Sequence, residues 1–198
     1  MGATGFASGD IGYIAPGTYR EVVTVNMTSA TVETQVLGDP ANAQGFKDGS
    51  GIPLTAGDVT WTAYITNDTT APSTSVLLNL NGRDFLTFKN LLMVGGNNST
   101  ASVVSGNTTN ATDIVLRDCV LIGIGTGPCI VYTGLADVAS NWTIDRCRFI
   151  CLLGSNVNGI NLNLPSSATA DYDTNLLVRS CIIFGGGIGV NINSSGAA

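Results

Sequence analysis

The feature that most constrains the fold of this chain is an internal repeat. Four segments align without gaps, and the first three begin at equal intervals: Leu86–Met93, Ile114–Leu121, Trp142–Phe149 and Leu176–Ile183. After a Gly-rich or polar step, each continues into a second strand-like stretch: Ala101–Ser105, Cys129–Tyr132, Gly159–Leu164 and Gly187–Ile192. A unit this small cannot bury its own apolar face, so it must stack on its neighbours through parallel strand pairing. The repeat therefore predicts an all-β solenoid.

The alternation of residues within the repeats predicts which side chains enter the core. We expect three inward columns with one residue from each repeat: Phe88, Leu116, Ile144 and Val178; Leu91, Cys119, Cys147 and Cys181; and Met93, Leu121, Phe149 and Ile183. The chain must bend between the first two columns, at Asn90, Asp118, Arg146 and Ser180. Asn and Asp tolerate the left-handed backbone that such a bend needs, whereas Arg and Ser fit it less well.

This recurring pattern of aliphatic, any residue, Asn or Asp, Cys, any residue, aliphatic resembles the right-handed parallel β-helix of the pectin-lyase-like superfamily. The stretch 9–25, which contains Pro16-Gly17-Thr18-Tyr19 and Glu21, is similar to the strand that opens many such helices. The resemblance is greatest to phage tailspike and decoration-type members. It implies one β-helix domain over residues 1–198, complete or a fragment of a longer chain, with a loop insertion at 37–56. Such a helix would have about six turns of about 4.8 Å each.

Charge and composition exclude several kinds of function. The chain carries a net charge of −6, has no His, and only 11% of its residues are charged. Nucleic-acid binding is carried largely by clustered Lys and Arg, so we expect no nucleic-acid partner. Without His, catalysis by Ser-His-Asp or Cys-His groups and imidazole metal sites are impossible within this chain. No apolar run is long enough to span a membrane and residues 1–7 do not resemble a signal peptide, so we expect no membrane partner.

The five cysteines, Cys119, Cys129, Cys147, Cys151 and Cys181, do not have the spacing of a metal site or of a disulfide framework. Three of them, Cys119, Cys147 and Cys181, share one inward column, where a small apolar side chain packs well. We therefore expect reduced core thiols, no metal and no cofactor. Unpaired thiols are typical of a protein that folds in a reducing compartment, here a host cytosol.

Two acids in the repeats, Asp118 and Asp145, stand on strand-associated positions and are the only candidates for catalytic carboxylates. The alignment places Arg117 beside Asp145 and Arg146 beside Asp118 on adjacent turns, about 5 Å apart. Arg179 follows Asp145 on the next turn. We therefore predict that Arg117, Asp118, Asp145, Arg146 and Arg179 form a structural charge ladder and assign no catalytic residue. Each exposed pair would stabilise the fold by about 0.2–1 kcal/mol.

These patterns leave functions of different classes open. The prediction we favour is a virion structural protein of a phage, such as a capsid decoration protein, a head fibre or a tailspike-like spike. It would be a homo-oligomer, with a trimer favoured, in contact with other virion proteins, and it would present loops to them or to host-surface polysaccharide. One alternative is a polysaccharide lyase or glycoside hydrolase of the pectin-lyase-like superfamily, and another is a fragment of a bacterial surface adhesin.

Overall fold

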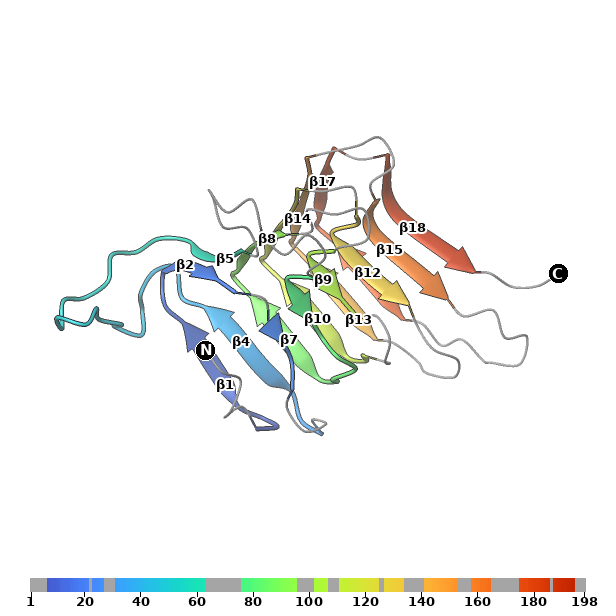
Figure 1. Cartoon of the computed structure of the whole chain (residues 1–198). Coiled ribbons are helices and arrows are strands. Elements are labelled where there is room, and N and C mark those ends of the chain that lie inside the picture. Colours follow the sequence, from blue (N-terminus) through green and yellow to red (C-terminus); the bar gives the residue numbers. More distant parts are fainter. Residues whose placement is uncertain are drawn as a thin grey trace.

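The computed structural model describes residues 7–21, 23–26, 31–62, 76–95, 102–106, 111–124, 127–133, 141–152, 158–164, 175–185 and 187–194. Within these ranges the regular structure consists of strands arranged in three parallel sheets of six strands each, and there is no helix (Figure 1). A helix long and apolar enough to cross a membrane is accordingly not found in the described part of the chain. The all-β prediction is confirmed at this level.

Successive strands along the chain belong to the three sheets in turn. Sheet A contains β1 (Ile11–Ile14), β4 (Thr34–Gly38), β7 (Leu86–Lys89), β10 (Ile114–Arg117), β13 (Trp142–Asp145) and β16 (Leu176–Arg179). Sheet B contains β2 (Gly17–Arg20), β5 (Val59–Thr62), β8 (Leu92–Gly95), β11 (Val120–Gly123), β14 (Arg148–Cys151) and β17 (Ile182–Phe184). Sheet C contains β3 (Val23–Thr24), β6 (Leu78–Asn79), β9 (Val104–Ser105), β12 (Ile130–Thr133), β15 (Asn158–Leu164) and β18 (Ile188–Ser194). This order is consistent with a parallel β-helix.

The strands pair in the register that the repeat predicts. Ile114 pairs with Leu86 on one side and with Trp142 on the other, and Trp142 pairs in turn with Leu176. Equivalent residues of successive turns therefore lie directly beside one another. We call one turn of chain, with its three strands, a rung.

The inward columns form the core. The side chains of Leu116, Ile144, Leu121 and Phe149 are fully buried, and Phe88 is nearly so. Members of the same columns on β16 and β17 are only half-buried, because these strands lie at the edges of their sheets. The alternation of the sequence thus identifies the core correctly, and the degree of burial depends on the position of the rung in the stack.

The bends between sheets A and B have the left-handed backbone that the sequence predicts. Asn90, Asp118, Arg146 and Ser180 have φ angles of 57°, 53°, 53° and 54°. This conformation is unfavourable for a residue with a side chain, by roughly 1–2 kcal/mol. Arg and Ser nevertheless adopt it, because in-register pairing on both sides of the bend imposes the same backbone path on every rung.

A second kind of bend, which the sequence analysis did not predict, precedes the strands of sheet A. Phe85 and Asp113 there have φ angles of 56°. The side chains at this position form a polar ladder: the Asn141 amide donates to Asp113 Oδ1 at 2.8 Å, and the Asn175 amide donates to Asn141 Oδ1 at 3.1 Å. The ladder ties three successive rungs together outside the core.

Between β4 and β5, residues 39–58 extend away from the sheets (Figure 1). Leu37 and Gly38, which the sequence analysis included in the loop, are the last two residues of β4. The loop is held by its own hydrogen bonds: Asp39 accepts from the backbone N–H groups of residues 43 and 44, at 2.9 and 2.7 Å. Asn42 donates to the carbonyl of Leu54 at 2.8 Å and so ties its two halves. The loop is therefore a built projection.

Gly38 provides a test of rung stacking. It is buried at the end of β4, and a Cβ atom at this position would run into the backbone carbonyl oxygen of Asn90 on the next rung. The neighbour is backbone at a bend that a hydrogen bond from Asn90 N–H to the Arg117 carbonyl oxygen holds at 3.2 Å, so it cannot move aside cheaply. We expect Gly38→Ala to destabilise the fold by about 1–3 kcal/mol, as overpacking does in other cores.

The measurement is urea-induced unfolding of the two variants Gly38→Ala and Gly49→Ala. Gly49 lies in the exposed loop, and a Cβ there would have no atom within 4 Å, so its variant is the matched control. Equal unfolding midpoints for the two variants would contradict the close approach of rungs at Gly38.

Candidate functional site

The outward face of sheet A carries a row of charged side chains. The register places Lys89 on β7, Arg117 on β10, Asp145 on β13 and Arg179 on β16 in one column. Asp118 and Arg146 follow at the adjoining bends. The structure therefore brings all five residues of the charge ladder, Arg117, Asp118, Asp145, Arg146 and Arg179, into one continuous cluster.

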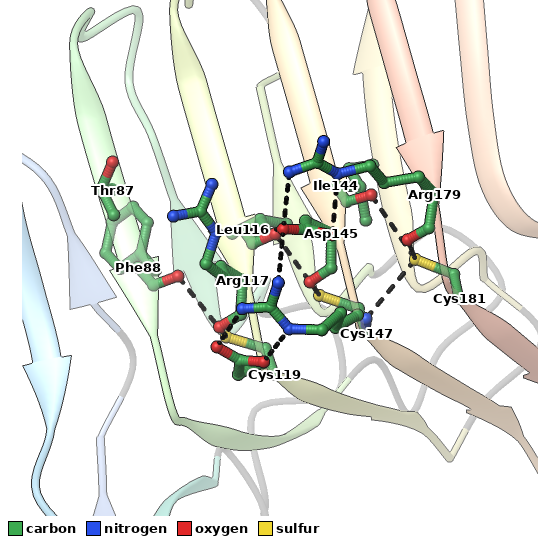
Figure 2. Close-up of polar contacts among 12 residues, drawn as sticks. Thr87, Phe88, Leu116, Arg117, Cys119, Ile144, Asp145, Cys147, Arg179 and Cys181 are labelled. Carbon is green, nitrogen blue, oxygen red and sulfur yellow. Dashed lines mark hydrogen bonds and ion pairs between the residues drawn. The ribbon is translucent and has the colours of Figure 1, made fainter.

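Asp145 is the centre of this cluster. Its Oδ1 accepts from Arg179 Nε at 2.9 Å, and its Oδ2 accepts from Arg179 Nη2 at 3.1 Å and from Arg146 Nη1 at 3.0 Å. On the other side, Arg117 Nε lies 3.2 Å from Oδ2 in an ion pair without a directed hydrogen bond. Figure 2 shows Arg117 and Arg179 on opposite sides of the Asp145 carboxylate. One carboxylate thus holds guanidinium groups from three rungs.

Asp118 forms the second pair of the ladder. Arg146 donates to it through two nitrogens, Nε to Oδ1 at 2.7 Å and Nη2 to Oδ2 at 2.9 Å. This parallel, two-point geometry is the strongest that Arg and a carboxylate can form. Because Arg146 also reaches Asp145, its guanidinium group joins the two acids.

Burial within the ladder differs from the sequence-based expectation of exposed pairs. The Asp145 side chain is only 2% exposed, whereas the side chains of Arg117, Arg146 and Arg179 are 38%, 50% and 53% exposed. The long arginine side chains cover the short acid and keep their own outer edges in water. The sequence could place the charged residues on adjacent rungs, but it could not show that three arginines converge on Asp145.

The arginines lower the pKa of both acids. Hydrogen bonding from Arg179 holds the pKa of Asp145 below its ordinary 3.8, and hydrogen bonding from Arg146 does the same for Asp118. A glycosidase needs one carboxyl group with a raised pKa to protonate the leaving group. Asp118 and Asp145 are instead both ionised and both occupied by donors, so they are suited to holding rungs in register and unsuited to donating a proton.

The predicted thiol column lies on the other side of the same bend. Cys119, Cys147 and Cys181 follow one another across three rungs (Figure 2). Each sulfur contacts two backbone carbonyl oxygens: the Cys119 Sγ lies 3.2 Å from the oxygen of Arg117 and 3.6 Å from that of Phe88 on the preceding rung. Cys147 and Cys181 repeat the arrangement at 3.2–3.5 Å. A thiol is a weak donor, so Cys at this position adds a second, weak contact to carbonyls such as that of Arg117, which already accepts the Asn90 N–H at 3.2 Å.

The other two cysteines lie elsewhere in the core and face each other. Cys129 Sγ and Cys151 Sγ are 3.6 Å apart, and both residues are buried. Their separation in the sequence gave no signal of this contact. Groups of three or more His, Cys, Asp or Glu side chains placed to hold a metal ion are not found in the part of the chain that the structure describes.

Comparisons with known proteins identify no relative of this chain. A scan against family models, a search of curated proteins and a search of solved structures each return no match. The class of this protein therefore rests on its own structure. In the residues that the structure describes, the regular structure is three parallel sheets of strands, consistent with a parallel β-helix, with ion pairs and thiols repeated at one line of bends.

Replacing Asp145 tests the role of the ladder. Asp145→Asn removes the charge that three guanidinium groups share, so we expect a lower urea midpoint of unfolding at pH 7. The pKa of Asp145 in the folded chain is below 3.8, so its ion pairs stabilise the fold fully above that pH. Their contribution is lost as the pH falls from 3.8 through the lower, folded value, and the variant should lose less stability over this range.

The control is Asp58→Asn, which removes the same charge from an exposed residue. Urea unfolding is measured for both variants at pH 7 and at pH values below 4. An Asp145→Asn chain as stable as the Asp58→Asn chain at pH 7, or equally sensitive to acid, would show that the ladder does not hold the rungs.

Proposed function

We propose that this chain is a structural protein of a phage virion: a stiff β-helical rod that presents loops to neighbouring subunits or to host-surface polysaccharide. The observation that carries the proposal is the occupation of its acids. Asp118 and Asp145, the two candidate catalytic carboxylates of the sequence, are both bound by arginines, including arginines of adjacent rungs. A passive structural role needs no unpaired carboxylate, whereas a β-helix that hydrolyses polysaccharide needs unpaired carboxyl groups at its active site.

We further propose that the helix is right-handed, of the pectin-lyase-like type, and has about six turns of about 4.8 Å. Connections between parallel strands of one sheet are right-handed in nearly all proteins, because right-twisted strands favour that path. The resemblance of the repeats to phage tailspike and decoration-type members supports the same assignment.

The cysteines and the loop favour this function. All five thiols are free in the structure, as expected of a protein that folds in a host cytosol. The loop at 39–58 projects from the sheets and is held by its own hydrogen bonds, so it can present a fixed surface. Its exposed side chains include Ile52, which is 62% exposed.

We propose that further copies of this chain associate through the outward face of sheet B and form a trimer. The outward positions of β8, β11, β14 and β17 form two columns, and seven of these eight residues are apolar. The first column contains Leu92, Val120, Arg148 and Ile182, of which Arg148 is the one charged residue. The second column contains Val94, Ile122, Ile150 and Phe184. Ile182 and Phe184 are 48% and 55% exposed. Partly exposed apolar columns that repeat from rung to rung favour side-by-side contact between copies arranged around an axis.

Light scattering tests the assembly. We expect a mass of about three times the 20.3 kDa of one chain. Ile122→Lys, which puts a charge in the middle of the sheet B columns, should reduce the assembly to monomers. Gln35→Lys adds the same charge on the outward face of sheet A and should leave the mass unchanged. A monomeric wild-type chain, or identical masses for the two variants, would contradict association through sheet B.

An activity assay tests the passive role directly. The chain is incubated with host capsule and with pectin-like polymers, and reducing ends and unsaturated products are measured. We expect no release, and the Asp118→Asn, Asp145→Asn double variant should differ from wild type in stability alone. Release that the double variant abolishes would identify the chain as a polysaccharide lyase or glycosidase instead.

A further inference from the structure

We propose that Cys129 and Cys151 form a site of reversible oxidation, at which a peroxide converts the two thiols into an internal disulfide that staples two adjacent rungs. The proposal stands on the geometry of the pair and does not depend on the proposed function. Cys129 and Cys151 do not pair with each other in the register of any two strands. The contact between their sulfurs depends on how two rungs pack in the folded chain.

The two cysteines belong to different rungs. Cys129 immediately precedes β12, in the rung formed by β10, β11 and β12, whereas Cys151 ends β14 in the next rung. Cys151 pairs in register with Gly123, and the sulfur of Cys129 packs on that glycine: a Cβ atom on Gly123 would lie 3.2 Å from it. Because Gly123 has no side chain, the Cys129 sulfur can lie against the backbone there and face Cys151.

The Cys129 sulfur lies closer to the Cys151 sulfur than to the carbonyl oxygens around it. They are 3.6 Å apart, whereas Cys129 Sγ is 3.9 and 4.0 Å from the carbonyl oxygens of Leu121 and Ile150. In the thiol column at the bends, by contrast, each sulfur has carbonyl oxygens at 3.2–3.6 Å. The thiols of the column thus have carbonyl oxygens as their near neighbours. The nearest polar neighbour of the Cys129 sulfur is the Cys151 sulfur. A disulfide bond is about 2 Å long, so the distance between the two sulfurs must shorten by less than one atomic diameter.

The two thiols are unequal in a way that suits stepwise oxidation. Hydrogen bonding from Cys129 lowers the pKa of Cys151 to about 7, and the same contact together with burial raises the pKa of Cys129. Cys151 is also the more accessible of the two, at 6% exposed against 0%, and it adjoins the exposed Leu152. The thiolate is the reactive form of cysteine, so Cys151 is the residue that reacts first.

The reaction balances with one peroxide molecule. The Cys151 thiolate attacks one oxygen of hydrogen peroxide; the O–O bond breaks, the departing hydroxide takes up a proton to become water, and Cys151 becomes a sulfenic acid. The Cys129 sulfur then attacks the Cys151 sulfur; the S–S bond forms, the S–O bond breaks, and the hydroxide leaves as a second water with the Cys129 proton. Two thiols are oxidised, one peroxide is reduced, and exchange with an added dithiol reverses the change.

The disulfide would close a covalent loop around β12, β13 and β14, which belong to all three sheets. Closing such a loop restricts the unfolded chain and so stabilises the fold. A chain that folds with reduced thiols and later meets a peroxide would therefore gain stability after folding.

The experiment treats the folded, reduced full-length chain with hydrogen peroxide, then denatures it and alkylates the remaining thiols. We expect three alkylated cysteines in place of five, a mass loss of about 2 Da before alkylation, and a peptide that links Cys129 to Cys151. The urea midpoint of unfolding should rise, and dithiothreitol should return it to the starting value. Cys119→Ser is the matched control, because it removes a buried column thiol and should leave the linked peptide and the shift intact.

Two variants distinguish the roles of the pair. Cys129→Ser should block the link and leave a sulfenic acid on Cys151 that dimedone traps, whereas Cys151→Ser should block both. Five alkylated cysteines after treatment, a link within the column of Cys119, Cys147 and Cys181, or a disulfide between two chains would each overturn the proposal. The wild-type peptide map decides the matter even if a variant fails to fold.

Discussion

The structure depends on one constraint: parallel strands of successive rungs pair with equivalent residues side by side. Ile114 between Leu86 and Trp142 is the plainest case. Because the register is fixed, the side chain at one position of a rung lies about 4.8 Å from the side chain at the equivalent position of the next rung. Apolar residues become core columns, asparagines become a hydrogen-bonded ladder, and alternating charges become ion pairs. The same constraint imposes a left-handed backbone on Arg146 and Ser180, residues that would not choose it.

The line of bends between sheets A and B concentrates these effects. On its outer side Asp145 binds arginines from three rungs, and on its inner side the thiol column contacts backbone carbonyl oxygens of the bend. The backbone hydrogen bonds between rungs continue through the bend, from Asn90 N–H to the Arg117 oxygen and from Asp118 N–H to the Asp145 oxygen, so the ion pairs and thiol contacts add to that pairing. Five of the chain's charged residues, which are 8 Lys or Arg and 14 Asp or Glu in all, belong to this cluster, and arginines hold both of its acids.

Much of the fold could be predicted from the sequence, because the repeat encodes the register. Phe88, Leu116 and Ile144 could be assigned to one buried column, and Asn90 and Asp118 to left-handed bends, from alternation and residue preference alone. The convergence of three arginines on Asp145 could not, since it depends on side-chain paths that spacing does not specify. The Cys129–Cys151 contact was also hidden: these residues fall at unequal positions of two rungs, and only Gly123 makes room for their sulfurs. The left-handed Phe85 was missed because aromatic residues rarely adopt that backbone.

The central claim, in-register stacking of rungs, is tested most directly by a double-mutant cycle on Asp118 and Arg146. The urea-derived free energy of unfolding is measured for wild type, Asp118→Ala, Arg146→Ala and the double variant. These residues are neighbours only if adjacent rungs stack in register, and their two hydrogen bonds are 2.7 and 2.9 Å long. A favourable coupling energy above experimental error, diminished by salt, is the result that the structure predicts. Strict additivity of the two single changes would show that the rungs do not stack in this register.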